Sequence, residues 1–416
     1  MASLAGLTRR SLVAAAGGAA FAGDTRIQPA AAAAAPAMST LSAGQFGAIG
    51  DGKADDTRAL ETALNAAFGD SPGILTVPPG IYRVTRTIRV VMTADARARS
   101  GVRAHGAHFI SSIEDGGNVF EFINRAETRL AVMEGLDILG THRDGHGIYI
   151  ESEGGQAFDS FCLRDTVVQY CGGDGAYLAG NISEGQVTNS YFRNNRGNGV
   201  TFSNGRNGAL LSGLHVFGCV FGDNGRHGAA IVDTCCDVSF HGCYFLQSGA
   251  FGLLAENGCT LLSNCGFENN CLAAPQFDAA NGGIYLKNFG TLVACMGYSM
   301  LKQGCLVRAE LGGQLVMVGC SGSGSAEAKA AGLALLSGAA TATATLVGCS
   351  GAVTYENGFE GLEIGGSGGG IRFGVDWRSR TLPRLGDYRL WIDARGHLRL
   401  KKGVPAADED GAIVGT

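Results

Sequence analysis

The sequence predicts an all-β solenoid, a sheet wound into many short coils, because one short strand pattern recurs along the chain. The clearest copy is His146-Gly147-Ile148-Tyr149-Ile150-Glu151, and glycine-led copies follow it at intervals of 28, 24, 29 and 24 residues. They start at Gly175, Gly199, Gly228 and Gly252, with weaker copies at Gly283, Gly304, Gly332 and Gly361. In each copy the apolar positions lie two residues apart, as in a strand with one buried face. A unit this short cannot bury that face alone, so the copies are expected to stack on one another.

Composition supports the same fold class and excludes several others. The chain has 416 residues, of which 67 are glycine, and only 17% are charged. Glycine without a three-residue period excludes collagen, and periodic apolar strands exclude a disordered chain. The formal net charge of −5 gives no basic surface for nucleic acid. Many tight turns between short strands account for the glycine, and a solenoid can use this length as a single domain.

The N-terminus has the features of an export signal. Thr8-Arg9-Arg10-Ser11-Leu12-Val13 precedes an Ala/Gly-rich apolar run that ends at Ala22. An arginine pair before a mildly hydrophobic stretch resembles a twin-arginine signal, and the alternative is an Ala-rich leader with a chance arginine pair. The apolar run is too short and too rich in small residues to predict a membrane span. Residues 1–37 are therefore assigned to the leader, and the mature protein is expected in the periplasm or outside the cell, without a membrane anchor.

Residues 44–90 carry the most specific motif. Phe46-Gly47-Ala48-Ile49-Gly50-Asp51-Gly52 is followed by Lys53-Ala54-Asp55-Asp56-Thr57 and by an amphipathic helix. The apolar face of this helix comprises Ala59, Leu60, Ala63, Leu64 and Ala67. Asp55 or Asp56 is placed to cap its first amides. A strand, a Pro78-Pro79-Gly80 turn and a second strand come next.

These features together resemble the start of the pectate-lyase superfamily of right-handed parallel β-helices. The resemblance covers residues 44–90 by motif and about 100–375 by repeat. It implies a single-stranded right-handed parallel β-helix over residues 38–376, in which the short helix covers the open end of the coil. Since lyases, glycoside hydrolases and phage tailspikes share this start, the resemblance does not select an activity.

The first coils are less regular than the later ones. Strands are expected near Val84–Val91, Phe109–Ser112, Val119–Ile123 and Leu136–Leu139, and the regular coil begins near Gly145. The expected inward-facing pairs are Ile148/Ile150, Ala176/Leu178, Val200/Phe202, Ala229/Ile231, Leu253/Ala255 and Ile284/Leu286. Asparagines in the turns, at Asn194-Asn195, Asp223-Asn224 and Asn269-Asn270, are expected to bond neighbouring backbone rather than to act on a substrate. The insert Cys271–Gly282 is longer than its counterparts and could overhang a groove.

Beyond Gly304 the repeat units are small and apolar, and residues 377–416 leave the repeat. Tyr388–Asp393 and His397–Leu400 alternate like two strands around a turn, so the sequence predicts a C-terminal hairpin with a polar tail from Pro405 to Gly415. We expect the hairpin to cover the last coil, with an assembly appendage as the alternative.

The thirteen cysteines follow the repeat. They lie between Cys162 and Cys349, and one occupies a similar place in successive units at Cys219, Cys243, Cys265, Cys295, Cys320 and Cys349. Disulfides or a metal site are the alternatives to buried thiols. Since no Cys-x-x-Cys pair occurs, a metal is disfavoured, and a ladder of small buried free thiols is the prediction.

Candidate functional residues cluster just before the repeating glycine. In stacked coils this position forms one column on the outside, which comprises His146, Asp174, Asn198, His227 and Phe251. Residues one or two places earlier are Asp144, Arg196 and Arg226, and outward strand positions add Tyr149, Glu151, Tyr177, Thr201 and Glu256. Any one of these residues alone fits an ordinary solvated turn. Because their polar groups occupy four consecutive coils and then end, the column is interpreted as a glycan-contacting surface.

The residue types in this column suggest chemistry on an acidic polysaccharide. Arg196 and Arg226 can bind sugar carboxylates, and tyrosine rings can pack on sugar faces. In β-elimination, His146 or Tyr149 would handle the proton and Asp174 would orient or assist it. Hydrolysis needs two carboxylates that flank one bond, for which Asp144 and Asp174 are candidates. The remaining residues, expected to bind substrate, are His227, Asn198, Tyr177 and Glu151. The numbers of these residue types slightly favour elimination or binding over hydrolysis.

Short motifs are similar to those of two enzyme groups without matching either fully. Gly145-His146-Gly147 is similar to the Gly-His-Gly of polygalacturonase-like hydrolases, but their aspartate pair and Arg-Ile-Lys are missing. Asp144-Gly145-His146 looks like the Asp-Pro-His of alginate epimerases, with glycine in place of proline. The aspartate cluster that holds Ca²⁺ in pectate lyases has no clear counterpart, so no metal site is predicted, although the column's carboxylates are compatible with Ca²⁺.

Two hypotheses of different classes follow. The first is an exported polysaccharide-active enzyme, a lyase before a hydrolase or an epimerase. The second is a non-catalytic polysaccharide-binding or surface β-helix, which would be compatible with an oligomer. Convergence of His146, Asp174, Arg196 and Arg226 in one groove would favour the enzyme.

Overall fold

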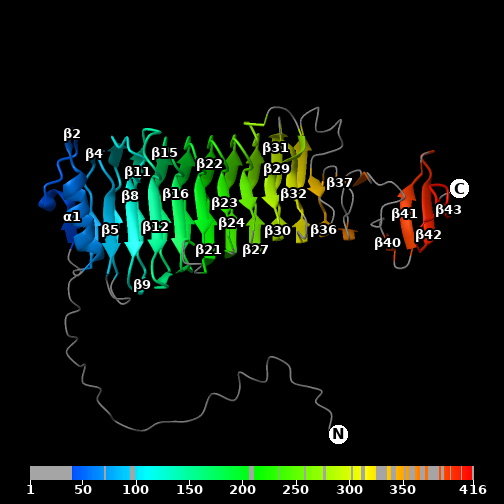
Figure 1. Ribbon diagram of the computed structural model, residues 1–416, viewed down its shortest axis with the longest axis horizontal. Helices are drawn as coiled ribbons and strands as arrows, with labels where there is room; N and C mark the ends of the chain where they lie inside the picture. Colours follow the sequence, from blue (N-terminus) through cyan, green and yellow to red (C-terminus); the bar gives the residue numbers. More distant parts are fainter. Residues whose placement is uncertain are drawn as a thin grey trace, which may run out of the picture. The chain divides into compact units, whose positions relative to one another are not determined.

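The computed structural model describes a parallel β-solenoid in which the chain passes through three sheets in turn (Figure 1). The described residues are 40–69, 72–93, 99–205, 210–233, 235–256, 259–274, 278–300, 303–310, 314–324, 335–338, 343–350, 353–355, 361–365, 371–372, 384–385, 388–393, 395–403 and 405–414. The predicted leader lies outside them. Among the residues described, no helix combines the length and apolar character that a membrane crossing requires.

Each of the three solenoid sheets is parallel, with one strand from each successive coil along its main path. The first sheet comprises β1 (Thr40–Ser42), β3 (Ile74–Thr76), β6 (Gly101–Arg103), β10 (Val132–Glu134), β14 (Cys162–Arg164), β18 (Gln186–Thr188), β21 (Ser212–Phe217), β24 (Cys236–His241), β27 (Cys259–Ser263), β30 (Phe289–Val293), β33 (Gln314–Val318), β36 (Thr343–Val347) and β38 (Gly361–Gly365). Short strands β9 (Thr128–Arg129), β13 (Phe158–Asp159) and β17 (Ile182–Ser183) extend this sheet sideways.

The second and third sheets complete each coil. The second comprises β2 (Asp51–Asp55), β4 (Gly80–Val84), β7 (Ala107–Ser111), β11 (Asp137–Leu139), β15 (Val167–Gln169), β19 (Tyr191–Arg193), β22 (Val220–Gly222), β25 (Tyr244–Leu246), β28 (Gly266–Glu268), β31 (Met296–Met300) and β34 (Ser321–Gly324). The third comprises β5 (Ile88–Met92), β8 (Phe120–Asn124), β12 (Ile148–Ser152), β16 (Ala176–Gly180), β20 (Val200–Ser203), β23 (Ala229–Ile231), β26 (Leu253–Ala255), β29 (Asp278–Leu286), β32 (Gln303–Ala309), β35 (Leu336–Gly338), β37 (Val353–Tyr355) and β39 (Ile371–Arg372).

The glycine that starts each repeat is required by close packing between coils. A Cβ atom at Gly147 would lie 2.3 Å from Cγ1 of Val168, and one at Gly199 would lie 2.3 Å from the carbonyl oxygen of Gly228. Neither separation is possible for a real side chain. The repeat is therefore glycine-led because the backbone of the next coil occupies the space of a side chain.

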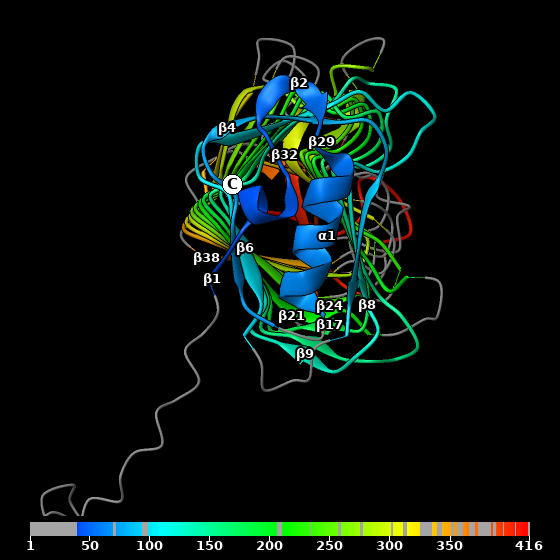
Figure 2. The same cartoon turned by 90° about the vertical axis from the view of Figure 1, so that its left-hand side faces the viewer.

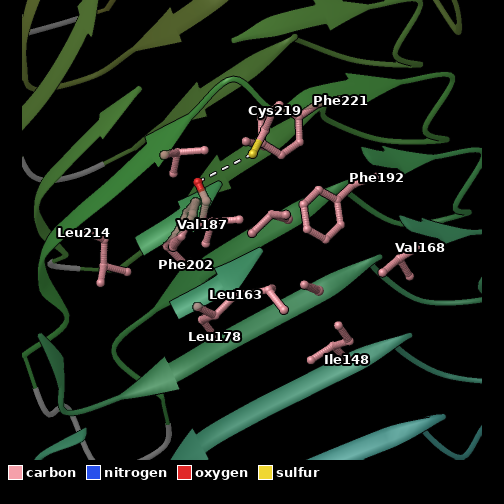
Figure 3. Close-up of a cluster of buried hydrophobic side chains, with 14 of the residues drawn as sticks. Ile148, Leu163, Val168, Leu178, Val187, Phe192, Phe202, Leu214, Cys219 and Phe221 are labelled. Atoms are coloured by element: carbon pink, nitrogen blue, oxygen red, sulfur yellow. Dashed lines mark hydrogen bonds between the residues drawn. The ribbon is translucent and has the colours of Figure 1, made fainter. Parts of the chain in front are cut away.

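The interior of the coil is filled by the predicted inward positions. All six predicted inward pairs are at most 1% exposed, which confirms them. Figure 3 shows this core, where Ile148, Leu178 and Phe202 come from the third sheet and Phe192 and Phe221 from the second. The phenylalanines of the second sheet stack from coil to coil, with ring centroids 5.7 Å apart for Phe192–Phe221 and 4.9 Å apart for Phe221–Phe245. Identical side chains in register give each coil the apolar contacts that it cannot make alone.

Polar ladders accompany this core. Asn195 donates from Nδ2 to Oδ1 of Asn224 at 3.1 Å, and Asn224 donates to the carbonyl oxygen of Phe192 at 3.0 Å. Both side chains are 1% exposed, so the structural role predicted for the turn asparagines is confirmed at these positions. The described cysteines are free thiols, and all but the half-buried Cys162 are buried. A hydrogen bond with the Cys219 thiol, together with burial, raises the pKa of Cys243 to about 12, so the Cys243 thiol stays protonated at neutral pH.

The N-terminal segment contains the predicted helix, α1 (Thr57–Phe68), after a short 3-10 helix η1 (Ala43–Phe46). Its buried face includes Leu60, Ala63, Leu64 and Ala67, and it packs against β5. Figure 2 looks along the coil with α1 at the near end. Asp55 accepts the amide proton of Thr57 at 3.1 Å, as a capping residue does. Asp56 does not cap the helix, since its carboxylate accepts the amides of Ile49 and Gly50.

Two local predictions need correction. The single strand expected near Val84–Val91 is two strands, β4 and β5, because the polar Thr85-Arg86-Thr87 forms the turn between the second and third sheets. The copy at Gly361 begins β38, which pairs with β36 in the first sheet rather than with the third. Gly332 lies outside the described residues.

Residues 384–414 form a separate antiparallel sheet of four strands instead of a hairpin with a tail. The predicted strands are β41 (Tyr388–Ile392) and β42 (Leu398–Lys402), flanked by β40 (Arg384–Leu385) and β43 (Ala412–Ile413). Trp391 is 1% exposed, and its indole N–H donates to the carbonyl oxygen of Asp408 at 3.0 Å. The supposed polar tail is thus part of a folded unit, because it covers the indole and supplies β43.

Candidate functional site

The outer face of the third sheet carries a polar groove that crosses β8, β12, β16 and β20. It consists of two adjoining hollows of about 440 Å³ and about 400 Å³, and His146 and Tyr149 line both. The first hollow is also lined by Tyr177, Ala179, Ser203, Gly205 and Asp233, and the second by Arg89, Asn118, Glu121, Glu151 and Glu153. We call the two hollows together the His146 groove.

Strand register explains why these residues meet. Tyr149 of β12 pairs with Glu121 of β8 on one side and with Tyr177 of β16 on the other. Glu121 in turn pairs with Arg89 of β5. All four therefore occupy one outward column, one residue per coil, at the ~4.8 Å spacing of paired strands. Glu151 lies two residues after Tyr149 on the same outer face.

Three rings form a stacked platform in the middle of the groove. The rings of Tyr149 and Tyr177 stack with centroids 5.6 Å apart and an interplanar angle of 15°. The imidazole of His146 lies 5.0 Å from the Tyr177 ring and 5.9 Å from the Tyr149 ring. The Tyr149 hydroxyl donates to Oε2 of Glu151 at 2.8 Å. The groove thus combines a flat aromatic surface with a phenol–carboxylate pair.

His146 is held in one orientation and in its neutral form. Its Nδ1 accepts the backbone amide proton of Asp174 at 2.9 Å, which places the proton of the neutral ring on Nε2. Burial lowers the pKa of His146, and the Asp174 carboxylate, whose Oδ2 lies 3.9 Å from Nδ1, offsets that effect only in part. At neutral pH this side chain is therefore a hydrogen-bond donor through Nε2 rather than a cation.

The predicted column of residues before the repeating glycine is a hydrogen-bond ladder between coils. Asn118 Oδ1 accepts the amide of His146 at 2.9 Å, and Asp174 Oδ1 accepts the amide of Asn198 at 2.6 Å. Asn198 Oδ1 accepts the amide of His227 at 3.0 Å. Asn118, Asp174 and Asn198 therefore each satisfy a backbone amide of the next coil.

Both predicted aspartates are bound by protein groups. Asp174 is 7% exposed, and its second oxygen accepts the Thr201 hydroxyl at 2.6 Å. Asp144 is 4% exposed and accepts the amides of Gly172 at 2.8 Å and Thr141 at 3.1 Å. These contacts place the two carboxylates within the turns.

The predicted arginines lie elsewhere on the surface. Arg196 is exposed, and its Nε donates to Nδ1 of His142 at 3.2 Å, on the turn that joins the second sheet to the third. Arg226 is exposed on the following coil. Neither arginine lines the His146 groove, whereas Arg89, Glu121, Glu153 and Asp233 do, although the sequence had not singled them out. Glu121 could have been found by aligning Phe120-Glu121-Phe122 with Ile148-Tyr149-Ile150.

His227 is buried rather than open to a ligand. It is 8% exposed, it stacks on Phe251 with ring centroids 5.8 Å apart, and its Nδ1 has no partner among the described residues. Burial, together with the neighbouring charge of Arg226, lowers the pKa of His227 to about 4.

This buried imidazole should make the fold sensitive to mild acid. Since the folded-state pKa of His227 lies below the ordinary 6.5, the unfolded chain binds the proton first as the pH falls. The contribution of the neutral ring to the free energy of unfolding is fully present above pH 6.5. As the pH falls from 6.5 to 4, the free energy of unfolding decreases by on the order of 3 kcal/mol. Urea unfolding at pH 7 and pH 4.5 measures this loss.

The control is a pair of histidine substitutions. His227→Asn should abolish most of the pH-dependent loss of stability, whereas the same substitution at the exposed His215 should leave that loss unchanged. An equal loss in His227→Asn and in the unsubstituted protein would contradict the assignment.

The described residues contain one group with metal-ligand geometry, formed by His105, Glu134 and Asp165. Glu134 already accepts a hydrogen bond from Arg164 at 2.9 Å, and Arg103 lies 3.3 Å from it. Two guanidinium groups on the central carboxylate oppose a divalent cation, so the group is an ion-pair cluster.

Three family models match different parts of the chain. The model of the right-handed β-helix region matches residues 122–294. A model described as rhamnogalacturonase A/epimerase, pectate lyase-like, matches residues 41–119, and one described as capsule depolymerase matches residues 359–416. No curated protein matches the chain.

Several solved structures have a similar fold. A protein of Geobacillus virus E2 has 19% identity and a TM-score of 0.55, over 87% of this chain and 66% of the viral one. The A-module of mannuronan C-5 epimerase AlgE4 from Azotobacter vinelandii has 14% identity and a TM-score of 0.51, over 80% and 98% of the two chains. The enzymatically active domain of tailspike protein 2 from bacteriophage CBA120 has 13% identity and a TM-score of 0.52, over 87% and 57%. The chain thus spans less than two thirds of the viral protein and of the tailspike domain. Because the sequence identities are this low, the similarity to these structures is evidence about the fold alone.

Proposed function

Because the chain is a right-handed parallel β-helix of the pectate-lyase superfamily, we propose that it is a polysaccharide-cleaving enzyme and that the His146 groove is its active site. The observation that carries the proposal is the presence of two glutamates, Glu121 and Glu151, in one hollow beside an aromatic platform. Capsule depolymerase, epimerase and tailspike proteins among the matches support a carbohydrate substrate.

The platform is suited to a sugar ring. The stacked faces of Tyr149 and Tyr177 offer an apolar surface, and the Nε2–H of His146 offers a donor to a sugar oxygen. Successive coils repeat at ~4.8 Å, so an extended glycan laid across the groove would meet new side chains at each coil.

Hydrolysis is the reaction that we propose for this site. Register and strand rise place the Cα atoms of Glu121 and Glu151 about 8 Å apart, on the same outer face. Two carboxylates at such spacing can flank one glycosidic bond. We assign Glu151 as the base, because the Tyr149 hydroxyl already donates to it and supports its charge. Glu121 accepts no hydrogen bond from any residue that the structure describes, and we assign it as the acid that protonates the leaving oxygen.

The charge of the groove selects between substrates. Among the described residues its lining carries Glu121, Glu151, Glu153 and Asp233 but only Arg89 as a cation, and a polyanion would be repelled. Since Arg196 and Arg226 lie outside the groove, the two guanidinium groups expected to bind sugar carboxylates are absent from it. We therefore propose a neutral glycan rather than the acidic polysaccharide that the sequence favours.

β-Elimination is the second candidate, and one contact favours it. Tyr149 lies between the carboxylate of Glu151 and the imidazole of His146, so its phenol could exchange a proton with Glu151 while His146 stabilises developing negative charge. Of the described lining residues, Arg89 would then be the only cation available to a substrate carboxylate. Elimination would use the same residues as hydrolysis. The two reactions can be distinguished by the chemistry of their products.

The other predicted site residues have supporting positions in this proposal. Asp174 orients His146 through its backbone amide, and the Asn198 side chain holds the next coil in register by accepting the His227 amide. We also propose that residues 1–37 direct export, which agrees with a polysaccharide outside the cell.

The proposal is tested by incubating the mature protein with neutral and acidic polysaccharides. New reducing ends and absorbance near 235 nm, typical of unsaturated uronates, are followed together. Reducing ends without absorbance are expected for a neutral glycan, whereas absorbance with uronic-acid polymers would establish elimination instead. Retained binding without either product, on every glycan, would identify a non-catalytic binding protein.

A further inference from the structure

A second groove lies on a different wall of the solenoid, on the outer face of the first sheet. It consists of hollows of about 520 Å³ and about 720 Å³ that share His215 as a lining residue. The first hollow is lined by Leu130, Ser160, Phe161, Cys162, Glu184 and Gln186, and the second mainly by Phe217, Asp237, Ser239, His241, Leu261 and Thr291. We call the two hollows together the His215 groove.

Strand register makes this groove continuous along the coil axis. Its floor is one outward column in which each residue pairs with the next. The column comprises Cys162, Gln186, His215, Ser239, Leu261 and Thr291. Five strand spacings give a length of roughly 24 Å. The groove is therefore long enough for an extended chain of several sugar units.

Hydrogen bonds to serine fix the orientation of both imidazoles in the groove. His215 Nδ1 lies 2.7 Å from the hydroxyl of Ser239, and that hydroxyl also donates to the carbonyl oxygen of Leu214 at 3.4 Å. Since the serine proton is used there, Nδ1–H donates to Ser239, and Nε2 of His215 is left as an acceptor. His241 Nδ1 lies 2.7 Å from the hydroxyl of Ser263.

Large apolar side chains stand exposed between these polar groups. Phe217 is 40% exposed, Leu261 41% and Leu130 46%. The ring of Phe217 stacks on His241 with centroids 4.9 Å apart and an interplanar angle of 18°. Exposed apolar groups rimmed by fixed polar groups mark a binding surface. The alternation of ring faces with hydroxyl, amide and imidazole groups is the chemistry of sugar recognition.

The charge of the lining restricts the ligand further. Glu184 and Asp237 are the charged residues of its described lining, which contains neither lysine nor arginine. A polyanion would again be repelled.

We propose that the His215 groove binds a segment of a neutral polysaccharide along the coil axis, as a non-catalytic site on a wall other than that of the His146 groove. The proposal rests on the proposed function in one respect, that the bound chain is the substrate of the His146 groove. A second site of this kind would hold the polymer against the enzyme while another segment is cleaved.

Cys162 offers a direct test, since it lies in the groove and is the one half-buried thiol among the described cysteines. Burial raises the pKa of Cys162, so alkylation by N-ethylmaleimide is followed at pH 8.5, and mass spectrometry identifies the labelled peptide. Dextran, cereal β-glucan and galactomannan are the neutral probes, and alginate and polygalacturonate are the acidic ones. We expect at least one neutral glycan to slow the labelling of Cys162 severalfold, and the acidic glycans to leave it unchanged.

Two matched variants assign the protection to one groove. Phe217→Ala should raise the glycan concentration that gives half protection about five- to tenfold. Tyr177→Ala, in the His146 groove, should leave the protection intact. Circular dichroism controls for folding of both variants.

Three outcomes would overturn the proposal. They are unprotected labelling with every neutral glycan, protection that Phe217→Ala does not weaken, and protection that rises with protein concentration in the absence of glycan. The last would show that a second copy of the chain covers the groove. Protection without cleavage of any glycan would support this binding site while contradicting the proposed enzymatic function.

Discussion

Replacing Glu151 by glutamine is expected to lower kcat by a factor on the order of 10² to 10⁴, with little change in glycan binding. The amide keeps the size of the side chain and still accepts the hydrogen bond from the Tyr149 hydroxyl, which is 2.8 Å long in the unsubstituted protein. What it loses is the ability to take up a proton. Initial rates of reducing-end release on the best neutral glycan measure the effect, and equilibrium binding of the same glycan shows whether the loss is in kcat.

Glu153→Gln is the matched control for this experiment. Glu153 lines the same hollow, but its Oε2 accepts a hydrogen bond from Arg125 at 2.8 Å, so it is occupied by a protein partner. Its substitution should change kcat less than about tenfold. Near-normal activity in Glu151→Gln, or an equal loss in both variants, would remove Glu151 from the proposed mechanism.

The second large effect concerns the phenylalanine stack inside the coil. Phe245→Ala is expected to lower the free energy of unfolding by about 3–5 kcal/mol, since it removes a buried ring and leaves a cavity that neighbouring coils cannot close. The Phe245 ring is fully buried, and its centroid lies 4.9 Å from that of Phe221 and 4.7 Å from that of Phe267. Urea unfolding followed by circular dichroism measures the change.

Phe217→Ala makes the same chemical change on the outer face of the first sheet. Because the Phe217 ring is 40% exposed, its removal should cost less than about 1 kcal/mol. If the two variants were destabilised equally, the stack would not carry the stability assigned to it. The variant also checks that a loss of glycan protection in Phe217→Ala is not a loss of folding.

The fold could be predicted in detail because a solenoid repeats one local rule. The alternation of Ile148 and Ile150, followed 28 residues later by Ala176 and Leu178, identifies both the buried face and the register. The glycine before each strand marks a place where the next coil leaves no room for a Cβ atom. Errors occurred where the repeat weakens, as at Thr85-Arg86-Thr87, whose turn divides one predicted strand into two.

The site was predicted less completely, for two physical reasons. First, the column before the glycine brings His146 and Asp174 together, but sequence does not tell a ligand-facing carboxylate from one that accepts an amide of the next coil, as Asp174 does. Second, the sequence does not indicate which way a side chain in a turn points. Arg196 points to His142 instead of into the groove. Glu121 was not predicted as a site residue because its coil precedes the regular repeat. Its pairing with Tyr149 nevertheless places it in the same hollow.

The most direct test of the central claim is a crystal structure of the Glu151→Gln variant with an oligosaccharide of the cleaved glycan. The account predicts a sugar ring on the platform of Tyr149 and Tyr177, with a glycosidic oxygen between Glu121 and residue 151. Sugar bound only in the His215 groove, or in neither groove, in a variant that has lost activity would contradict the assignment of the active site to the third sheet.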